Sequence, residues 1–393
     1  MPEIMKSLKI DRVLIDTTIA HFVNDGLSYL PYYLIVLIKE GYKLTFFQNS
    51  LILMVYYLGG AVISPIMGRY IDNVKKKGFM MGIGLFLFSI SFILLAIPYP
   101  KGLSIYCFMA GMFVISIFST IYHPIGSMIL NRKYRENAGT ALGINGIGGG
   151  IGRAVFPGIF LLFNGIFKDF SISLIFLTII MAILGLYVAL DLRKEEFFVE
   201  QKKKNSLFKF SLPITILLIA TILRTMAISG GSAMLPSYMN ITLGFNSTIV
   251  GIIVVLAYTS AIFGQPFLGY LSDKFSRTLI LILTSALYGI LIIILMFLQN
   301  ILTVSIVYIL SYFVGLSNFP LLMALVGKIS KDSDLAENSA IIFGLGGGIG
   351  GALGTFLIGF MGQVINTHIS FIIMGIVSIV SAIIILFIPL NKK

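Results

Sequence analysis

The sequence predicts an all-α integral membrane protein with twelve transmembrane helices, arranged as two parallel six-helix repeats. Three observations lead to this prediction: the composition, the length of the apolar stretches and an internal repeat. Of the 393 residues, 58% are hydrophobic and only 11% are charged, whereas soluble domains carry about 25% charged residues. The chain therefore lacks the charge to cover a water-soluble protein of this size, and much of its surface must face lipid.

The apolar stretches are long and continuous, which is typical of membrane-spanning helices. Such a helix needs about 20 mostly apolar residues, whereas a membrane barrel would show short alternating strands. The predicted spans cover residues 13–38, 46–68, 79–97, 103–128, 138–164, 170–190, 210–237, 246–271, 279–298, 301–327, 339–364 and 369–390. The first is longer than a signal-peptide core and has no cleavage pattern after it, so we expect it to be retained.

The distribution of Lys and Arg predicts the orientation of these spans. Of the 28 basic residues, 22 lie in the termini or in loops on the side of the N-terminus, and four lie in the opposite loops. Because cytoplasmic loops carry the excess of Lys and Arg, we expect both termini in the cytoplasm and the spans in a plasma membrane. The basic clusters are separated by apolar runs, so membrane lipid is the expected partner and nucleic acid is not.

An internal repeat predicts the domain organisation. The polar stretch 193–209 is expected to be a cytoplasmic linker between an N-terminal bundle, residues 1–192, and a C-terminal bundle, residues 210–393. The element P-x-x-G-x-x-x-D begins at Pro65 and again at Pro266, 201 residues later. The run G-x-G-G-G-I-G occurs at 146–152 and 344–350, and a weaker pair sets Gly26 against Gly231. Six spans separate the copies, so the repeat is parallel.

The six-plus-six pattern, the basic middle loop and the G-x-x-x-D loops resemble the major facilitator superfamily over the whole chain. The family's loop pattern, G-x-L-a-D-r-x-G-r-r, is met by residues 68–77, with departures at Asn73 and Lys75. Within the superfamily, H-F-V-N-D at 21–25 and Y-H-P at 122–124 are similar to the fosmidomycin-resistance type of drug exporter. The resemblance implies the major facilitator fold, in which two halves rock about a central cavity and expose it alternately to each side.

The resemblance also implies a conformational role for the G-x-x-x-D loops, which latch the cytoplasmic ends of the halves together in the outward-open state. The residues assigned to this role are Gly68, Asp72, Gly269, Asp273 and Arg277. The alternative is that the loops serve only topology and orientation. In that case glycine allows close approach, aspartate caps a helix and the basic residues face anionic lipid.

Several kinds of chemistry are excluded. Residues 346–351 formally match G-x-G-x-x-G, but no strand precedes them, and G-x-x-x-G spacing inside a span packs helices together. The chain has no P-loop motif, and its single cysteine, Cys107, lies in an apolar run. The sequence therefore predicts a protein that is not an enzyme and that carries neither a cofactor nor a metal.

Two arginines lie within predicted spans, where each charge costs about 2.5 kcal/mol or more unless it is paired or faces water. At 1.5 Å per residue, Arg153 lies about 22 Å into span five and Arg224 about 20 Å into span seven. Because they come from opposite halves, an anion held between them would touch both moving bodies. Arginine suits carboxylate, phosphate or phosphonate, so both are assigned to substrate binding. The alternative for Arg153 is an internal pair with Asp25.

The ionisable residues of span one predict a proton-coupling site. His21 and Asp25 are four residues apart and share one helix face, so they can form a hydrogen-bonded pair that exchanges a proton. His123 is assigned to the same role, although a helix kink at Pro124 is the alternative. A purely structural pair with Arg153 remains the alternative for Asp25. Asp16, nearer the cytoplasmic end, is expected to be interfacial.

Other polar residues inside spans are assigned to the substrate pathway. They are Asn145, Tyr258, Gln265 and Asn318. Each could equally form a hydrogen bond between helices.

The predicted function is secondary active transport by alternating access, as proton-coupled export (antiport) of a small anionic or amphipathic organic molecule or drug. One alternative is uptake or exchange of an organic acid or phosphate ester. Another is a membrane sensor or scaffold that moves no solute, although buried charges in both halves argue against it. The expected partners are a small-molecule substrate, protons and membrane lipid, and the expected functional unit is a monomer.

Overall fold

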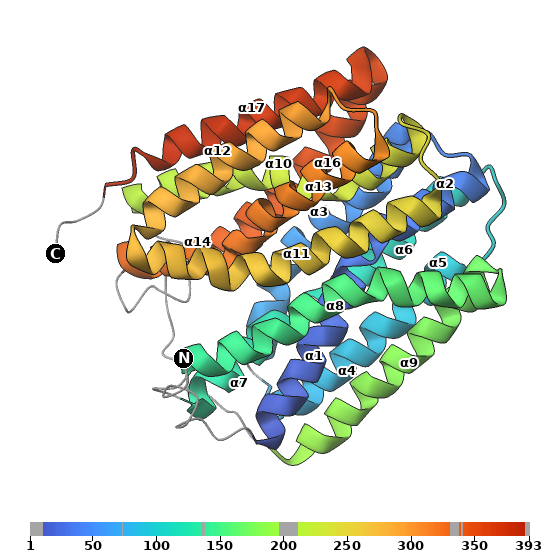
Figure 1. The fold of residues 1–393 in the computed structure, drawn as a ribbon. Coiled ribbons are helices and arrows are strands. Elements are labelled where there is room, and N and C mark those ends of the chain that lie inside the picture. Colours follow the sequence, from blue (N-terminus) through green and yellow to red (C-terminus); the bar gives the residue numbers. More distant parts are fainter. Residues whose placement is uncertain are drawn as a thin grey trace. The chain divides into compact units, whose positions relative to one another are not determined.

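The computed structural model describes residues 11–72, 74–134, 138–195, 211–330, 338 and 341–389. Within these ranges every regular element is helical and no strand occurs (Figure 1). Nine helical stretches of the described residues are long and apolar enough to cross a membrane. The prediction of an all-helical membrane fold is thereby confirmed.

Eight of these nine stretches each coincide with one predicted span, and the ninth, Ile341–Ile385, covers the last two. Within it the backbone becomes extended at Asn366 (φ −173°, ψ 142°), whose side chain accepts a hydrogen bond from His368 N. This cap starts a new helix. The last two spans are therefore separate helices, α16 (Gly347–Met361) and α17 (Thr367–Ile385).

The two remaining predicted spans are each divided into shorter helices. The first forms α1 (Arg12–Tyr29) and α2 (Pro31–Tyr42), and α1 carries three charged residues within its 18. The tenth forms α13 (Ile301–Gly315), a 3₁₀ turn (Leu316–Asn318) and α14 (Phe319–Ile329). These two spans are not among the nine stretches for two reasons. The helix α1 carries too many charged residues, and α13 has only 15 residues.

The remaining helices follow the predicted spans closely. They are α3 (Phe46–Asp72), α4 (Lys77–Ser91), α5 (Ile93–Ala96), α6 (Ser104–Ser119), α7 (Tyr122–Tyr134), α8 (Ala138–Phe167), α9 (Phe170–Asp191), α10 (Leu212–Ile241), α11 (Ser247–Lys274) and α12 (Arg277–Leu295).

The chain divides into two compact units. Unit 1 consists of Met1–Pro31 and Val62–Lys203, and unit 2 of Tyr32–Ala61 and Lys204–Lys393. The segment Tyr32–Ala61, assigned by sequence to the N-terminal bundle, groups with unit 2. Most of the predicted linker, residues 193–209, lies outside the described residues, so the linker and bundle boundaries stay a prediction.

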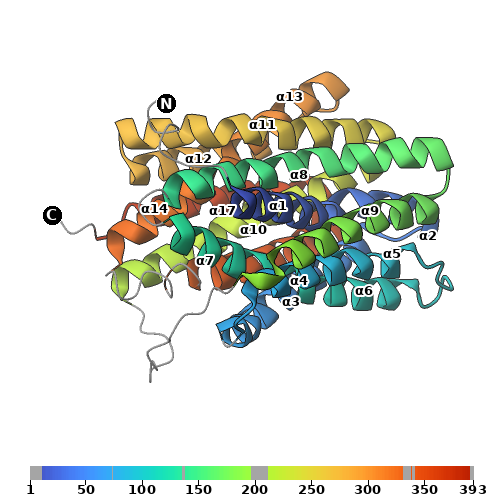
Figure 2. The same cartoon turned by 90° about the horizontal axis from the view of Figure 1, so that it is seen from below.

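In unit 1 the closest helix pairs are α1 with α8 and α4 with α9 (Figures 1 and 2). Glycines on α8 allow the backbones to touch. A Cβ at Gly148 would lie 2.6 Å from the carbonyl oxygen of Thr18, and one at Gly152 would lie 2.1 Å from that of Phe22. Such distances exclude any side chain, as the helix-packing interpretation of this glycine-rich run predicts.

Unit 2 repeats this packing, with α10 against α16 and α12 against α17. A Cβ at Gly350 would lie 2.6 Å from the carbonyl oxygen of Ile222, and one at Gly354 would lie 2.1 Å from that of Met226. The pattern of contacts along α16 is the same as along α8.

These matching contacts set the register of the repeat. Gly148 corresponds to Gly350, whereas the sequence pairing of 146–152 with 344–350 placed it on Gly346. The sequence pairing is wrong by four residues, about one helical turn, because a glycine-rich run looks alike when shifted by one turn. On the partner helix, Gly26 corresponds to Gly230 and not to Gly231.

Candidate functional site

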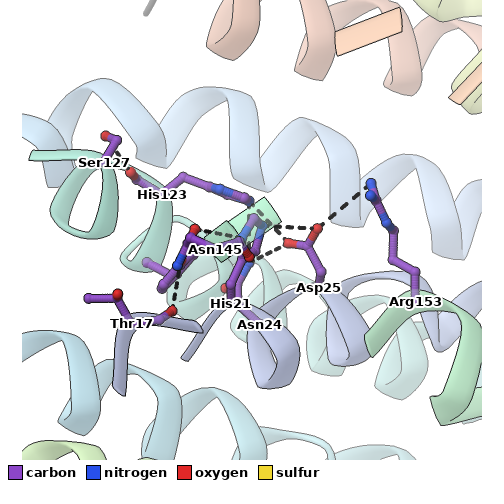
Figure 3. Close-up of polar contacts among 9 residues, drawn as sticks. Thr17, His21, Asn24, Asp25, His123, Ser127, Asn145 and Arg153 are labelled. Carbon is purple, nitrogen blue, oxygen red and sulfur yellow. Dashed lines mark hydrogen bonds and ion pairs between the residues drawn. The ribbon is translucent and has the colours of Figure 1, made fainter. Parts of the chain in front are cut away.

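Asp25 on α1 is the centre of a polar cluster in unit 1 (Figure 3). Its side chain is only 7% exposed. His21 Nε2 lies 3.3 Å from its Oδ2, and His123 Nε2 lies 3.4 Å from its Oδ1. On the other side, Arg153 Nη1 lies 3.7 Å from Oδ2. The structure thus brings together the three residues assigned to proton coupling and one arginine assigned to substrate.

The contacts of His21 fix which ring nitrogen carries a hydrogen. Nδ1 lies 2.9 Å from the backbone oxygen of Asn145, and a carbonyl oxygen can only accept, so Nδ1–H is the donor. In the neutral ring Nε2 then presents a lone pair to the Asp25 carboxylate at 3.3 Å. This contact is attractive only when a further proton lies between the two atoms, on the imidazole or on the carboxyl.

Neighbouring polar groups hold this pair in place. The Tyr122 hydroxyl donates to Asn145 Oδ1 at 3.0 Å, and the same Oδ1 lies 2.9 Å from His21 Nδ1. Asn24 Nδ2 donates to Asp25 Oδ1 at 3.2 Å. The sequence analysis included Tyr122 and Asn24 only as letters of short motifs. No periodicity along α1 could have shown that Tyr122 packs here, because it comes from α7.

A break between two helices places His123 in the cluster. α6 ends at Ser119, and α7 begins at Tyr122 and continues to Tyr134. The predicted span ends at residue 128, about one turn beyond His123, whereas α7 continues for eleven residues after His123. The helix is therefore longer than the predicted span, and the depth of His123 in the membrane stays a prediction. The helix is interrupted just before Pro124, so the predicted irregularity exists together with the contact to Asp25.

Gly149 on α8 leaves the space that the pair occupies. A Cβ there would lie 2.5 Å from His21 Nε2 and 2.9 Å from Asp25 Oδ2. The sequence analysis assigned the whole run 146–152 to helix packing, which describes Gly148 and Gly152. Gly149 differs because side chains of the site, and not the backbone of α1, fill its place.

Arg153 lies beyond Asp25 from the two histidines (Figure 3). Its guanidinium carbon is 5.3 Å from the centre of the Tyr29 ring, a distance at which cation–π attraction acts. The internal contact with Asp25, which the sequence left as an alternative, is therefore present. The assignment of Arg153 to substrate stays a prediction.

The capacity of the cluster for a metal ion is limited by this arginine. His21, Asp25 and His123 each offer one ligand atom, and these atoms lie within 4.8 Å of one another. A divalent cation bound there would compete for Asp25 with Arg153, whose Nη1 lies 3.7 Å from Asp25 Oδ2. The positive guanidinium would repel the cation. A proton fits the cluster better than a metal ion does.

Arg224 on α10 has different surroundings in unit 2. Its side chain is buried, Nε donates to Ser285 Oγ at 3.1 Å, and Nη2 donates to the Gly315 carbonyl at 3.1 Å. Both acceptors are neutral. Within the described parts of the chain no acidic group pairs with Arg224. This buried guanidinium therefore lacks the carboxylate that Arg153 has.

Of the other residues assigned to the substrate pathway, Asn145 is part of the cluster around Asp25, whereas Tyr258 and Gln265 belong to α11. Tyr258 is buried, with its ring 5.3 Å from that of Tyr312. Gln265 is half-buried on α11. The side chain of Asn318 lies outside the described residues.

The residues assigned to the cytoplasmic loops are described only in part. Gly269 is half-buried near the end of α11, and Arg277 is exposed at the start of α12. Gly68, Asp72 and Asp273 lie on helices, but their surroundings fall outside the described part of the structure. The latch role of these loops stays a prediction.

Comparison with known proteins decides the family. Residues 17–215 and 217–393 match the Major Facilitator Superfamily. The chain belongs to the major facilitator superfamily. It is a multi-pass membrane transporter of this type and not an enzyme.

A curated relative of this major facilitator protein is an uncharacterized MFS-type transporter, YfnC, of Bacillus subtilis (strain 168). It is 28% identical over 145 residues, which span 37% of this chain and only 34% of YfnC. This relative is not described as a fosmidomycin-resistance protein, so the resemblance to that type of exporter stays a prediction.

Solved major facilitator structures share the fold at low identity. One is a bacterial homologue of the human lysosomal transporter Spinster, inward-facing and occupied, with 13% identity, a TM-score of 0.76 and 96% of each chain covered. A POT family transporter in complex with a thioalcohol-conjugated peptide has 17% identity and a TM-score of 0.75, with 95% of each chain covered. A point mutant of the nucleoside transporter NupG has 14% identity and a TM-score of 0.74, covering 96% of this chain and all of NupG. These similarities extend over the whole fold.

Proposed function

We propose that this transporter couples substrate movement to a proton that binds at His21, Asp25 and His123. The observation that supports this is the 3.3 Å contact between His21 Nε2 and Asp25 Oδ2, because Nδ1 already donates to a carbonyl oxygen. The contact has room for one exchangeable proton. The His123 side chain is 39% exposed, which gives a proton a way into an otherwise buried cluster.

Arg153 links the proton to the charge of the substrate. Without the proton, Asp25 compensates the guanidinium of Arg153. With the proton bound, the pair of His21 and Asp25 gains one positive charge and Arg153 loses part of its compensation. An anion near Arg153 therefore binds better when the proton is present, and by reciprocity it strengthens proton binding.

Arg224 supports the same class of substrate from unit 2. A buried guanidinium that contacts only neutral acceptors is costly in a membrane protein unless an anion or water reaches it. The planar guanidinium matches carboxylate, phosphate or phosphonate. We therefore propose a small organic anion as the substrate, bound and released by alternating access.

The charge of the substrate determines the mode of coupling. For an anion, the contact between Arg153 and Asp25 favours movement of the proton together with the substrate, as in uptake of an organic acid or phosphate ester. Export by antiport needs an amphipathic substrate whose cationic or donor group takes the place of the proton at Asp25. This second candidate is supported by the exporter-like motifs at 21–25 and 122–124, which supply the three residues of the cluster.

The experiment is proton flux in proteoliposomes that contain a pH-sensitive dye. Carboxylates, phosphate esters, phosphonates and cationic amphiphiles are added outside one class at a time. We expect an anion to acidify the lumen as proton and anion enter together. Alkalinisation by a cationic amphiphile would instead support antiport. If no solute of the four classes moves protons, the proposal of proton coupling is wrong.

Matched variants test the residues. Asp25→Asn and His21→Gln are expected to abolish the proton flux, because each removes a partner of the shared proton. His368→Gln is the control, since this third histidine contacts Asn366 and Tyr238 instead. Substrate flux that still follows an imposed pH gradient in Asp25→Asn would contradict the assignment. From the positions of its Lys and Arg residues we propose that both termini are cytoplasmic; a plasma membrane and a monomeric functional unit stay predictions.

A further inference from the structure

A second carboxyl of α1 lies outside the cluster around Asp25. Asp16 is fully buried, and neither of its carboxyl oxygens has a hydrogen-bond partner among the described residues. It is nine residues before Asp25, about two and a half turns, so it faces the opposite side of the helix. Its position in the second turn of α1 agrees with the expected place near the cytoplasmic end of span one, and the structure adds that the side chain is buried within the protein.

The side chains that face Asp16 come from α9. They are Asp191, the last residue of that helix, and Tyr187, one turn earlier. Asp191 Oδ2 lies 3.1 Å from Arg12 Nε, and Arg12 Nη2 also donates to Glu195 Oε1 at 3.1 Å. The single guanidinium of Arg12 therefore serves two carboxylates already, and Asp16 has no cation of its own.

The other charged groups on helices that pack against α1 are engaged elsewhere. On α4, Lys77 Nζ donates to the carbonyls of Ile71 and Val74, both at 2.7 Å. On α7, Arg132 is exposed, and three other basic groups of α7 and α8 contact carboxylates of unit 1 other than Asp16. These pairs are His123 with Asp25, Lys133 with Asp11 and Arg153 with Asp25.

We propose that Asp16 and Asp191 form a second proton-binding site, in which one proton shared by the two carboxyls holds α1 against α9. A buried carboxylate that faces no cation of its own and only one tyrosine hydroxyl is unfavourable, and two facing carboxyls do not both ionise readily. The proton on Asp16 donates to one oxygen of Asp191, while Asp191 Oδ2 keeps its contact with Arg12. The site is separate from the proposed coupling site and does not depend on a transported substrate.

Loss of this proton at rising pH should weaken the packing of α1 against α9. At rising pH the two carboxyls become two negative charges beside one arginine, and Glu195 competes for that arginine. The contact between α1 and α9 then weakens. The protonated pair is thus the tightly packed form, and the site stabilises unit 1 more at acidic than at alkaline pH.

The test is infrared difference spectroscopy of the purified full-length protein in lipid nanodiscs. At mildly acidic pH, the wild-type spectrum minus that of Asp16→Asn should contain the C=O stretch of a protonated carboxylic acid. The band should disappear at alkaline pH. Asp191→Asn should lose the same band, because Asp16 then ionises against the amide of Asn and the guanidinium of Arg12. The control Asp25→Asn should keep it.

Thermal unfolding of the same samples gives a second measurement. The melting temperature of the wild type should fall from acidic to alkaline pH more steeply than that of Asp16→Asn. A spectrum of Asp16→Asn identical to wild type overturns the site, and a band that survives in Asp191→Asn overturns the sharing of the proton. Neither readout involves transport, so failure of proton coupling at Asp25 would leave this result unaffected.

Discussion

Units 1 and 2 share their helix packing but differ in the charges that this packing surrounds. In the register set by the glycine contacts, Arg153 corresponds to Thr355 and Asp25 corresponds to Ser229. The Thr355 hydroxyl donates to the carbonyl of Gly351 within its own helix. Unit 2 therefore has no counterpart of the ion pair in unit 1, and its buried cation lies on α10, at the position of Ala20 in α1.

This difference in surroundings suggests different roles for the two arginines, which the sequence alone could not distinguish. In unit 1, the arginine neighbours a carboxylate that also contacts two histidines, an arrangement that responds to a proton. In unit 2, Arg224 contacts only neutral groups, an arrangement that responds to an anion. We infer that proton binding and anion binding are divided between the halves of the repeat. The predictions that follow test this division.

Among the variants that compare the two units, Asp25→Asn should have the largest effect on stability and on proton flux. It leaves Arg153 buried without its carboxylate, so the free energy of unfolding should fall by about 3 kcal/mol, and proton flux should be lost. Denaturant unfolding and proteoliposome flux measure the two effects. Asp169→Asn is the control, because Asp169 is an exposed N-cap of α9 and asparagine caps equally well. Equal stability of both variants would show that Arg153 does not depend on Asp25.

Arg153→Met and Arg224→Met should differ in their effect on stability. The first leaves Asp25 with less compensation and should destabilise by about 2–3 kcal/mol, whereas the second removes a buried charge without an acidic partner and should change stability by less than about 1 kcal/mol. Both should lose flux of the anion. If Arg224→Met destabilises as strongly as Arg153→Met, the two arginines have equivalent surroundings and the comparison fails. Arg224→Lys tests whether charge alone suffices for flux.

Glycine variants sharpen the comparison between the two units. Gly149→Ala should destabilise by about 1–3 kcal/mol, since it adds a methyl group to a filled space, and Gly354→Ala should destabilise more, because its methyl group meets backbone and not side chains. Only Gly149→Ala should impair proton flux, because its Cβ meets His21 and Asp25 while that of Gly354→Ala meets the backbone of Met226. Gly143→Ala, with nothing within 4 Å of its Cβ, is the control. Impaired proton flux in both buried variants would point to general loss of packing.

The smallest effect concerns the first turns of α1 and α10. Burial disfavours the charge of Asp11, but hydrogen bonds from Tyr134, Lys133 and Leu14 N outweigh it and hold the pKa of Asp11 below its ordinary range. Asp11→Ala should therefore cost about 1 kcal/mol at neutral pH. Because the folded-state pKa is lowered, this difference should vanish as pH falls through it.

Ser211 provides the matched comparison, since it caps α10 without a side-chain hydrogen bond. Ser211→Ala should leave the melting temperature unchanged at any pH. A pH-independent difference between Asp11→Ala and wild type would mean that the charge of Asp11 contributes nothing.

Much of the fold could be predicted because lipid imposes a simple rule on sequence. Apolar stretches between polar breaks reproduce the helices, although several spans, among them one, four and ten, are divided into shorter helices. The pairing of His21 with Asp25 also follows from their spacing on one helix. These features depend on neighbours along the chain, which a single sequence displays.

What could not be predicted depends on contacts between helices. The difference between Arg153 and Arg224 arises from which side chains other helices bring beside them. The role of Gly149 is invisible in a run of similar glycines, and the one-turn error in the repeat has the same origin. The length of the helix after His123 could not be predicted, because polar residues at the end of α7 continue the helix beyond the apolar stretch.

The contact between Arg153 and Asp25 has a consequence for energetics across the membrane. If one proton enters with one singly charged anion, the cycle carries no net charge. The membrane potential, which acts on each uncompensated charge with about 2.3 kcal/mol per 100 mV, then contributes nothing to accumulation. Uptake would follow the pH difference alone and continue in a depolarised membrane.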